Sequence, residues 1–302
     1  MSVIHHKSCI GVAVLVASLA SWARANPIPP QQLTVDGASP HVYKSIGGNQ
    51  LRLHVFGPES ATPQERRPAI VFFFSGGWLE GSITQFVPQA HHFAERGMVA
   101  ILVDYRVFGR HSTTPFESIA DAKSALRWVR AHATQLHVDP TRIVASGGSA
   151  GGHIALSAAL FSRFDEAGED RTISSKPNAL VLFNPTVDTT HTWLGHLQER
   201  FGDRALEGSP LHHLGPDLPP TLILHGKADT KAPFADVTRF CAAARVYGNQ
   251  CQIVGYAGAK HGFFNPRHGN GKWFNETLRD VDKFLIGLGY QHDPATMPIP
   301  KV

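Results

Sequence analysis

The chain has 302 residues, of which 42% are hydrophobic and 17% are charged, and its formal net charge is +4 at pH 7. This length and apolar content fit one large folded domain with a sizeable core. The small positive charge does not indicate a nucleic acid partner, because no dense run of lysines and arginines occurs in the sequence.

The N-terminal 25 residues have the pattern of a secretory signal peptide. Lys7 precedes an apolar run at residues 9–19, and Ala23-Arg24-Ala25 forms an A-x-A cleavage signal. We therefore expect cleavage after Ala25 and a secreted or periplasmic protein. An uncleaved membrane anchor is the alternative, although the apolar run is shorter than the ~20 residues that a membrane span needs. Residues 26–40 are rich in proline and polar side chains and predict an N-terminal arm.

Predicted strands and helices alternate along the rest of the chain. A hairpin is expected first, from residues 42–46 and 51–55 on either side of Gly47-Gly48-Asn49. Apolar or β-branched runs predict further strands at residues 69–74, 99–103, 142–145, 179–183, 221–225 and 252–256. Helix-compatible stretches predict helices at residues 85–96, 116–135, 154–160, 234–247 and 273–288. Pro140 is expected to close the loop before the strand at 142–145.

This alternation predicts an α/β protein with a doubly wound, mostly parallel sheet. The domain is expected to extend over residues 41–290 and to be followed by a C-terminal tail at residues 291–302. Residues 186–218 have no strand pattern, and we expect them to form a small cap insertion of short helices. The sequence contains no visible internal repeat and no second domain.

The segment Gly147-Gly148-Ser149-Ala150-Gly151 lies between a predicted strand and a predicted helix. A serine in this position is typical of a nucleophile elbow, where a strained turn exposes the hydroxyl above the sheet. Gly147 and Gly151 fit the pattern because side chains there would collide with the neighbouring strand and helix. The alternative interpretation is a glycine-rich turn without chemistry, and the partners of Ser149 distinguish the two.

A serine nucleophile needs a base, and the base needs a carboxylate that fixes its tautomer. Asp229 follows the strand predicted at residues 221–225, and His261 follows the strand predicted at residues 252–256. The order Ser149, Asp229, His261, with each residue after a strand, is the order of an α/β-hydrolase triad. The alternatives are Asp236 as the acid and His225 or His268 as the base.

An oxyanion hole needs two or three N–H groups near the nucleophile. Ala150 directly follows Ser149 and is expected to supply one, and Gly76 and Gly77 follow the strand at residues 69–74 and are expected to supply the others. The alternative role of these glycines is a tight turn that needs positive φ. Trp78 and Phe263 are candidate walls of the substrate site, with simple packing as the alternative.

The spacing of histidines, cysteines and acidic residues matches no metal-ligand pattern, so we expect no metal. Four histidines are interpreted as surface residues of the cap: His191, His196, His212 and His213. Cys9 leaves with the signal peptide, so Cys241 and Cys251 remain as a pair in an oxidising compartment. We expect an intrachain disulfide between them; two separately buried thiols are the alternative.

Five motifs carry a resemblance to a known family. They are Phe74-Ser75-Gly76-Gly77-Trp78, Asp104-Tyr105-Arg106, Gly147-Gly148-Ser149-Ala150-Gly151-Gly152-His153, His225-Gly226-Lys227-Ala228-Asp229 and His261-Gly262-Phe263. Over about residues 45–290 the chain resembles the α/β-hydrolase esterases of the hormone-sensitive-lipase-like and bacterial carbohydrate (acetyl or feruloyl) esterase groups. The resemblance implies an esterase with the triad named above and no cofactor. One motif departs from the family, because its His-Gly-Gly-Gly sequence is replaced here by Phe74-Ser75-Gly76-Gly77.

These observations predict a secreted serine esterase that works through an acyl-enzyme. We expect its substrates to be short-chain, acetyl-type esters of carbohydrates or related polar alcohols, either small molecules or polysaccharides. The cap candidate is too short and polar for the broad apolar lid of a long-chain lipase. The alternatives are a prolyl-oligopeptidase-type peptidase, which usually has a large additional domain, and a non-catalytic hydrolase-like binding protein, which usually lacks a triad member.

Overall fold

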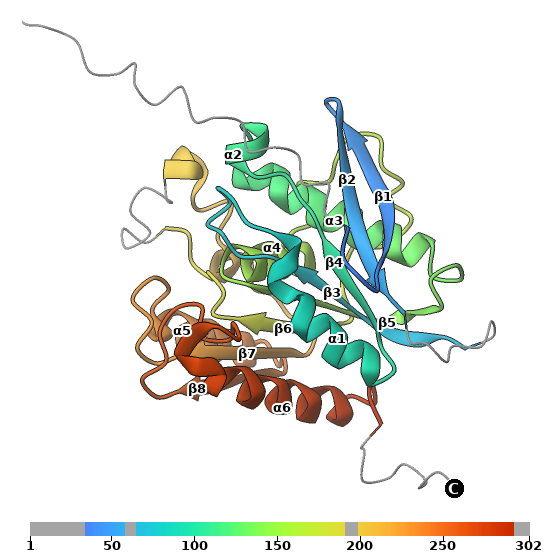
Figure 1. Cartoon of the computed structure of the whole chain (residues 1–302). Helices are drawn as coiled ribbons and strands as arrows, with labels where there is room; N and C mark the ends of the chain where they lie inside the picture. The colour runs from blue at the N-terminus through green and yellow to red at the C-terminus, as the bar shows by residue number, and fades with distance from the viewer. Residues whose placement is uncertain (1–33, 58–64, 191–198, 293–302) are drawn as a thin grey trace, which may run out of the picture.

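The computed structural model describes residues 34–57, 65–190 and 199–292. Within them, eight strands form one sheet in the order β1-β2-β4-β3-β5-β6-β7-β8 (Figure 1). The pairs β1–β2 and β2–β4 are antiparallel, and all other neighbouring pairs are parallel. The strands are β1 (Ser39–Ile46), β2 (Asn49–Phe56), β3 (Arg67–Phe73), β4 (Val99–Val103), β5 (Val138–Gly148), β6 (Ala179–Phe183), β7 (Thr221–Gly226) and β8 (Cys251–Tyr256). The prediction of an α/β fold with a mostly parallel sheet is confirmed.

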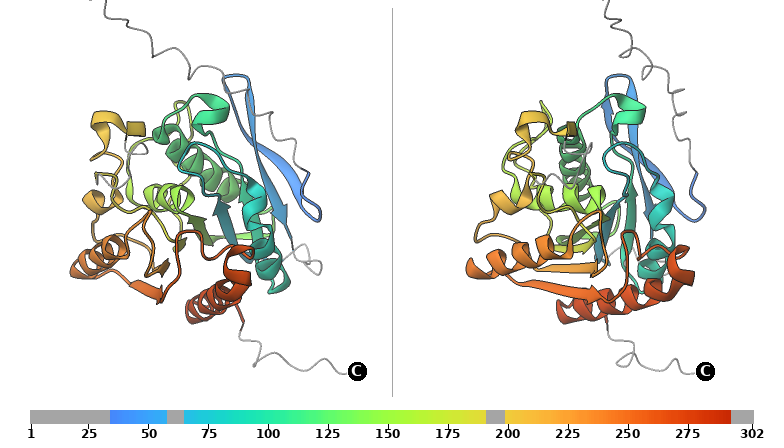
Figure 2. Two further views of the ribbon diagram at one scale, coloured as in Figure 1. Left: turned by 60° about the vertical axis from the view of Figure 1, so that its left-hand side comes forward. Right: turned by 90° about the vertical axis from the view of Figure 1, so that its left-hand side faces the viewer.

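Helices cover both faces of this sheet. Figure 2 shows α1 (Val87–Glu95) and α6 (Lys272–Gly287) on one face, and α3 (Pro115–Ala131), α4 (Ala150–Leu160) and α5 (Phe234–Val246) on the other. Every residue of β4, β6 and β7 is buried, which is the expected state of strands between two helical layers. The short helix α2 (Phe108–His111) lies between β4 and α3 in the chain. Because the neighbouring strands from β4 and β3 through to β8 are parallel, their carboxyl ends meet at one edge of the sheet.

The ends of the domain differ slightly from the predicted boundaries. β1 begins at Ser39 and Val35 is buried in the core, so the fold begins before residue 41. At the other end, Gln291 is buried, and its Nε2 lies 3.4 Å from Sδ of Met98. The domain therefore includes residues that the sequence pattern assigned to an arm and a tail. The proposed signal peptide at residues 1–25 lies outside the described residues.

The helix predicted at residues 116–135 ends earlier, at Ala131. Its start is fixed by a capping box, in which the Thr114 hydroxyl accepts from the N–H of Phe116 and the Glu117 carboxylate accepts from the N–H of Thr114. After Ala131 the chain must turn back toward the sheet, and His137 adopts a positive φ of 55° in that turn. This turn explains why residues 132–135, which were predicted to be helical, lie outside the helix.

The strand that leads to Ser149 also begins earlier than predicted. β5 starts at Val138 and includes Pro140, which was expected to lie in a loop. Its register against β3 shifts between the pairs Arg67–Val138 and Ala69–Ile143. This bulge accommodates a proline, which has no N–H to donate to a regular ladder.

The described parts of the predicted cap, residues 186–190 and 199–218, contain short 3-10 helical segments and no strand. They include η3 (Gly202–Arg204) and η4 (Pro210–His213). The hydroxyl of Thr189 donates to the carbonyl of Ala205, and the N–H of Leu211 donates to the carbonyl of Val187. His191 and His196 lie outside the described residues. Among the helices of the described residues, none has the length and apolar character that a membrane span requires.

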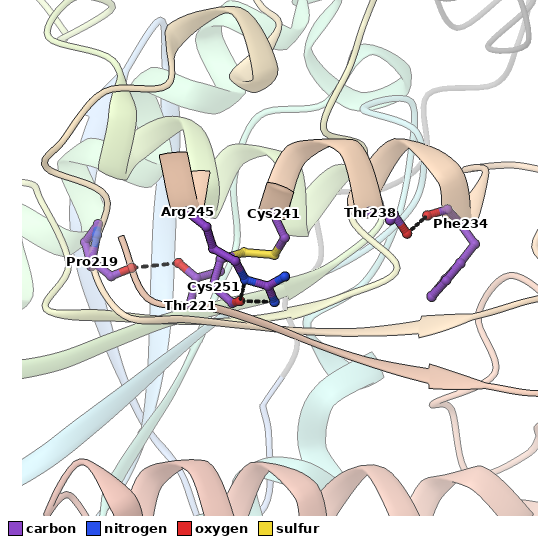
Figure 3. Close-up of a disulfide and its surroundings, with 7 residues drawn as sticks. All are labelled: Pro219, Thr221, Phe234, Thr238, Cys241, Arg245 and Cys251. Atoms are coloured by element: carbon purple, nitrogen blue, oxygen red, sulfur yellow. Dashed lines mark hydrogen bonds between the residues drawn. A yellow bond between two sulfur atoms is a disulfide. The ribbon is translucent and has the colours of Figure 1, made fainter. Parts of the chain in front are cut away.

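Cys241 of α5 and Cys251 at the start of β8 are joined by a disulfide (Figure 3). Their Cα atoms are 5.3 Å apart, within the usual range for a disulfide. Next to it, Arg245 donates from Nε and Nη2 to the carbonyl of Cys251, at 2.9 and 2.6 Å. The disulfide and the arginine both attach α5 to the strand that leads toward His261.

Candidate active site

Ser149 occupies a sharp turn between β5 and α4. Its φ and ψ are 52° and −118°, a region that residues with side chains rarely adopt. The N–H of Ser149 donates to the carbonyl of Phe183 at 2.9 Å, and its own carbonyl accepts from the N–H of His153 at 2.9 Å. The turn is thus held by β6 on one side and by the first turn of α4 on the other.

Glycines permit the close approach of strand and helix at this turn. A Cβ atom on Gly151 would lie 2.1 Å from the carbonyl oxygen of Phe73, and one on Gly147 would lie 2.5 Å from the carbonyl carbon of Gly151. Both distances are well inside van der Waals contact, so any side chain would force α4 away from the sheet. Glycine is therefore needed at positions 147 and 151 for the predicted reason, which is that a side chain there would collide with the neighbouring strand and helix.

The structure brings together the three residues that the sequence singled out as a triad. Oγ of Ser149 lies 3.0 Å from Nε2 of His261, and Nδ1 of His261 lies 2.7 Å from Oδ2 of Asp229. Asp229 follows β7 and His261 follows β8, so all three stand at the carboxyl edge of the sheet. This geometry allows His261 to accept the serine proton at Nε2 while Asp229 holds the proton on Nδ1.

Asp229 is buried in a set of donors that favours its ionised form. Oδ1 accepts from the N–H groups of Lys231 and Ala232, at 2.8 and 2.9 Å. Burial by itself raises the pKa of the Asp229 carboxyl, but hydrogen bonds from His225 and His261 and from the N–H of Ala232 outweigh burial and hold the pKa well below its ordinary value. The carboxylate is therefore negative at neutral pH and can stabilise a positive imidazolium on His261.

The alternative acid and bases have other partners. His225 is fully buried; its Nε2 lies 2.8 Å from the carbonyl oxygen of Ala232 and 3.4 Å from Oδ2 of Asp229. Asp236 forms an ion pair with Arg239 at 3.3 Å. The ring of His268 lies beside Gly262 and has no hydrogen bond to Ser149 among those of the described residues. His225 is thus a supporting partner of Asp229 rather than a substitute for His261.

Sequence reasoning missed Asn184. This buried residue directly follows β6, with a φ of 35°, and its Nδ2 lies 3.4 Å from Nε2 of His261. Its Oδ1 accepts from the N–H of Gly262 at 3.1 Å. The available signal was its position, because a polar residue after a buried strand stands at the edge where the other site residues gather. Asn184 helps to hold the loop that carries His261.

The predicted oxyanion loop lies against the elbow. Gly76 and Gly77 follow β3 with φ values of 136° and 63°, and a Cβ on Gly76 would lie 2.0 Å from the carbonyl oxygen of Glu80. A Cβ on Gly148 would lie 2.6 Å from Oγ of Ser75, which places the loop next to the residue before Ser149. Within the described part of the chain, the N–H groups of Gly76, Gly77 and Ala150 donate no hydrogen bond to the protein. They remain available to a developing oxyanion.

The predicted role of Trp78 and Phe263 as substrate walls is wrong. Trp78 is 1% exposed, and its indole packs edge-on against His153 and Phe201 with ring centroids 5.0 Å away in each case. Phe263 is 2% exposed and packs against Tyr256. Such large apolar side chains gain most from complete burial, and here neither presents a ring face to a substrate.

His153 connects α4 to the cap segment. It is fully buried, and its Nε2 lies 2.7 Å from the carbonyl oxygen of Gly208. Burial lowers the pKa of His153 to about 4, although the hydrogen bond to Gly208 acts in the opposite direction. The imidazole is therefore neutral at pH 7, with its proton on Nε2.

No group of three or more histidine, cysteine or acidic side chains in the described ranges is arranged to hold a metal ion. Of the cap histidines that can be placed, His212 bonds to the hydroxyl of Ser209 at 2.8 Å, and His213 packs against the ring of Phe161. The described residues thus give these two histidines partners within the protein.

Two family models match the sequence. The BD-FAE model matches residues 53–243, and the dienelactone hydrolase family model matches residues 207–284. Among solved structures, esterase 2 of Thermogutta terrifontis phosphoramylated by tabun is 44% identical, with a TM-score of 0.83, over 87% of this chain and 99% of that one. The propionate-bound form of that esterase is 44% identical with a TM-score of 0.81, over 88% and 98% of the two chains.

Several sequence relatives are named as esterases. The probable carboxylic ester hydrolase LipM of Mycobacterium tuberculosis is 32% identical over 61% of this chain and 46% of its own length. Esterase LipQ of the same organism is 28% identical over 72% and 55% of the two chains. The chain thus spans about half the length of these relatives. The BD-FAE model matches more than half of the chain, the triad geometry is present, and a solved esterase is similar over 87% of this chain. We conclude that the chain belongs to the BD-FAE family of α/β-hydrolase esterases and lipases.

Proposed function

We propose that this protein is a serine carboxylesterase. The proposal rests on the hydrogen bonds that connect Ser149 to His261 and His261 to Asp229. Ser149 itself lies in the strained turn of the nucleophile elbow. The esterases named above support it. One related esterase has been phosphoramylated by tabun, and attachment of an organophosphate needs a nucleophilic side chain.

In the proposed reaction, Ser149 Oγ forms a bond to the ester carbonyl carbon and its proton passes to Nε2 of His261. The carbonyl oxygen becomes an oxyanion that the N–H groups of Gly76, Gly77 and Ala150 bind. His261 then gives the proton to the departing alcohol, which leaves an acyl group on Ser149. A water molecule attacks this acyl-enzyme while His261 takes its proton, and the acid leaves as Ser149 regains its hydrogen.

Paraoxon tests the nucleophile directly. We expect it to abolish hydrolysis of p-nitrophenyl acetate and to add a diethylphosphoryl group to the peptide that contains Ser149, as read by mass spectrometry. The Ser149→Ala variant should take up no such group and hydrolyse no ester. An adduct on another side chain, with Ser149 unmodified, would reject the assignment.

For the substrate we propose a short acyl group on a carbohydrate or similar polar alcohol. Propionate-bound and butyrate-bound forms of the related esterase support the acyl part of this proposal. A panel of acetylated sugars, feruloyl esters and simple aryl esters tests the alcohol. A peptidase would instead cleave a chromogenic prolyl peptide, and a binding protein would release no product from any of these compounds.

We further propose that residues 1–25 direct export and are removed, so that the mature protein is secreted or periplasmic and begins at Asn26. The A-x-A sequence at Ala23-Arg24-Ala25 supports this proposal. Intact-mass measurement of protein recovered from the periplasm or medium tests it. Recovery of a species that still carries residues 1–25 in a membrane fraction would favour an anchor.

A further inference from the structure

The loop that carries Gly76 and Gly77 lacks the sequence that supports it in similar esterases, so its support must come from elsewhere. The peptide group between Phe74 and Ser75, directly before Gly76, is held at both ends. Its carbonyl accepts from the hydroxyl of Tyr105 at 2.7 Å, and its N–H donates to Oε1 of Gln85 at 2.7 Å. The orientation of this peptide sets the direction in which the chain enters the two glycines.

The Gln85 side chain continues to the other half of the site. Gln85 belongs to η1 (Ile83–Phe86), and its Nε2 donates to Oδ1 of Asn265 at 3.2 Å. Nδ2 of Asn265 in turn donates to the carbonyl of Gly262 at 2.8 Å, next to His261 in the chain. Two side-chain amides thus connect the oxyanion loop to the histidine loop across 180 positions of sequence.

Buried residues beside the two amides support the connection. The rings of Phe86 and Phe264, which neighbour Gln85 and Asn265 in the chain, stack with centroids 5.4 Å apart. Both rings are buried. Gln89, one turn further along the chain, donates to the carbonyl of Phe264 at 3.5 Å. The two amides, which are themselves half-buried, are thus attached to a closely packed part of the core.

We infer that Gln85 and Asn265 are positioning residues that fix the oxyanion donors Gly76 and Gly77 relative to His261. The inference rests on the proposed function. The oxyanion N–H groups and the base must act on one substrate carbonyl at once, although β3 and β8 carry them from distant parts of the chain. A displacement of about 1 Å at such a site can cost roughly 100-fold in rate, so a direct bridge between the two loops matters to the transition state.

The test uses the full mature enzyme and three variants. Gln85→Met and Asn265→Leu keep similar volume and remove the hydrogen bonds, and the third variant combines both changes. For each single variant we expect kcat on p-nitrophenyl acetate to fall by roughly 10-fold to 100-fold, with KM changed by less than about 3-fold. The double variant should lose about as much as one single variant, because either change already breaks the bridge.

Inhibition by an aryl trifluoromethyl ketone separates positioning from folding. The Ser149 oxygen bonds to the ketone carbon, its proton passes to His261, and the carbonyl oxygen becomes an oxyanion in the same hole. We expect Ki for the variants to rise in parallel with the loss of kcat. Gln135→Met is the matched control, because Gln135 is exposed and its side chain makes no hydrogen bond within the described residues. Its kcat and Ki should equal those of the wild type.

Several outcomes would overturn the inference. They are an unchanged kcat in both single variants, losses that multiply in the double variant, or an unchanged Ki per active site as titrated with paraoxon. If Gln85→Met does not fold, Gln85→Glu takes its place, since it keeps an acceptor for Ser75 and loses the donor to Asn265. It should reduce kcat about as much as Asn265→Leu does, because both variants break the bridge and keep the bond to Ser75. A kcat near the wild-type value in Gln85→Glu, or a change in KM alone, would reject positioning. Inactivity of the wild type would reject the proposed function itself, whatever the variants do.

Discussion

Ser149 combines the proposed nucleophile with a backbone conformation that a side chain disfavours. At a φ of 52°, glycine is less strained than any residue with a Cβ. We therefore expect Ser149→Gly to be more stable to unfolding than Ser149→Ala by about 1 kcal/mol. Both variants should lose esterase activity by roughly 10⁴-fold or more, because both lack the hydroxyl. Urea unfolding and a p-nitrophenyl ester assay measure the two effects.

The comparison of these two variants isolates strain, because neither carries the hydroxyl. An alanine variant as stable as the glycine variant would mean that the turn stores no strain at Ser149. Activity near the wild-type level in either variant would move the nucleophile to another residue.

His153 should make stability depend on pH. Its folded-state pKa of about 4 lies below the ordinary value of 6.5, so the unfolded chain binds the proton more tightly than the native protein does. The contribution of the neutral imidazole is fully present above about pH 6.5 and is lost as the pH falls toward about 4. A loss of ~3 kcal/mol over that interval is expected from this group.

Replacement of this histidine by glutamine, which does not titrate, tests that expectation. Glutamine can still donate to the carbonyl of Gly208, so the connection to the cap segment need not be lost. The free energy of unfolding of His153→Gln should fall less steeply between pH 6.5 and pH 4 than that of the wild type. Parallel curves for the two proteins would assign the pH dependence to other groups.

The site residues that could be predicted from the sequence are those that lie in a short recognisable motif or directly after a recognisable strand. Ser149 has a glycine pattern around it, and Asp229 and His261 each follow a recognisable strand. Asn184, Gln85 and Asn265 have no such pattern, because their roles depend on contacts between segments that only the folded chain brings together. The predicted role of Trp78 and Phe263 as substrate walls was wrong for a related reason. Sequence places them near the site but does not tell whether a ring faces the substrate or the core.

At the scale of elements, the contact between α4 and β3 decides whether the elbow can form. A Cβ on Gly151 would lie 2.1 Å from the carbonyl oxygen of Phe73 and 2.3 Å from that of Phe74. We expect Gly151→Ala to destabilise the protein by roughly 3 kcal/mol, since backbone atoms must move to relieve the overlap. The same movement carries Ser149 and the oxyanion loop apart, so activity should be lost as well.

Gly287→Ala is the control for this change. Gly287 is the last residue of α6 and has no atom within 4 Å of an added Cβ. Alanine there should leave activity unchanged and raise stability slightly, by up to ~1 kcal/mol. Thermal unfolding and ester hydrolysis of both variants give the answer, and a fully active, stable Gly151→Ala protein would show that the elbow tolerates a wider separation.

The centres of the strands and helices were predictable from apolar runs, whereas their ends were not. The bulge at Pro140 and the turn at His137 arise from the pairing of β5 with β3, which is a long-range contact. Local patterns extended the helix at residues 116–135 because nothing in those residues alone marks where the chain must return to the sheet.

At the scale of the whole molecule, the disulfide between Cys241 and Cys251 constrains the unfolded chain. It closes a loop with a sequence separation of 10 residues. We expect its removal in Cys241→Ser/Cys251→Ser to cost roughly 2–3 kcal/mol of stability. Ser149 and the oxyanion loop lie on other elements, so kcat should change little. Two titratable thiols in the denatured, unreduced protein would show that the bond does not form.

The acyl preference depends on how much space the packed core leaves beside Ser149. The ring of Phe264 packs against Gly148, directly before the nucleophile, and in the core it stacks with Phe86 and lies tilted against Phe183. An acyl chain that extended toward this side of Ser149 would have to displace these buried rings, which costs more than it gains. Each methylene that does fit adds ~0.8 kcal/mol of binding, so efficiency should rise with length until the space is filled.

We therefore expect kcat/KM to peak at about two to four acyl carbons, where the apolar gain and the available volume balance. A series of p-nitrophenyl esters from acetate to decanoate measures it. If Phe264 sets the limit, Phe264→Leu should shift the maximum toward longer chains, with its folding checked by thermal unfolding. A wild-type maximum at about eight carbons or beyond, or activation at an oil–water interface, would instead indicate a true lipase with an apolar groove.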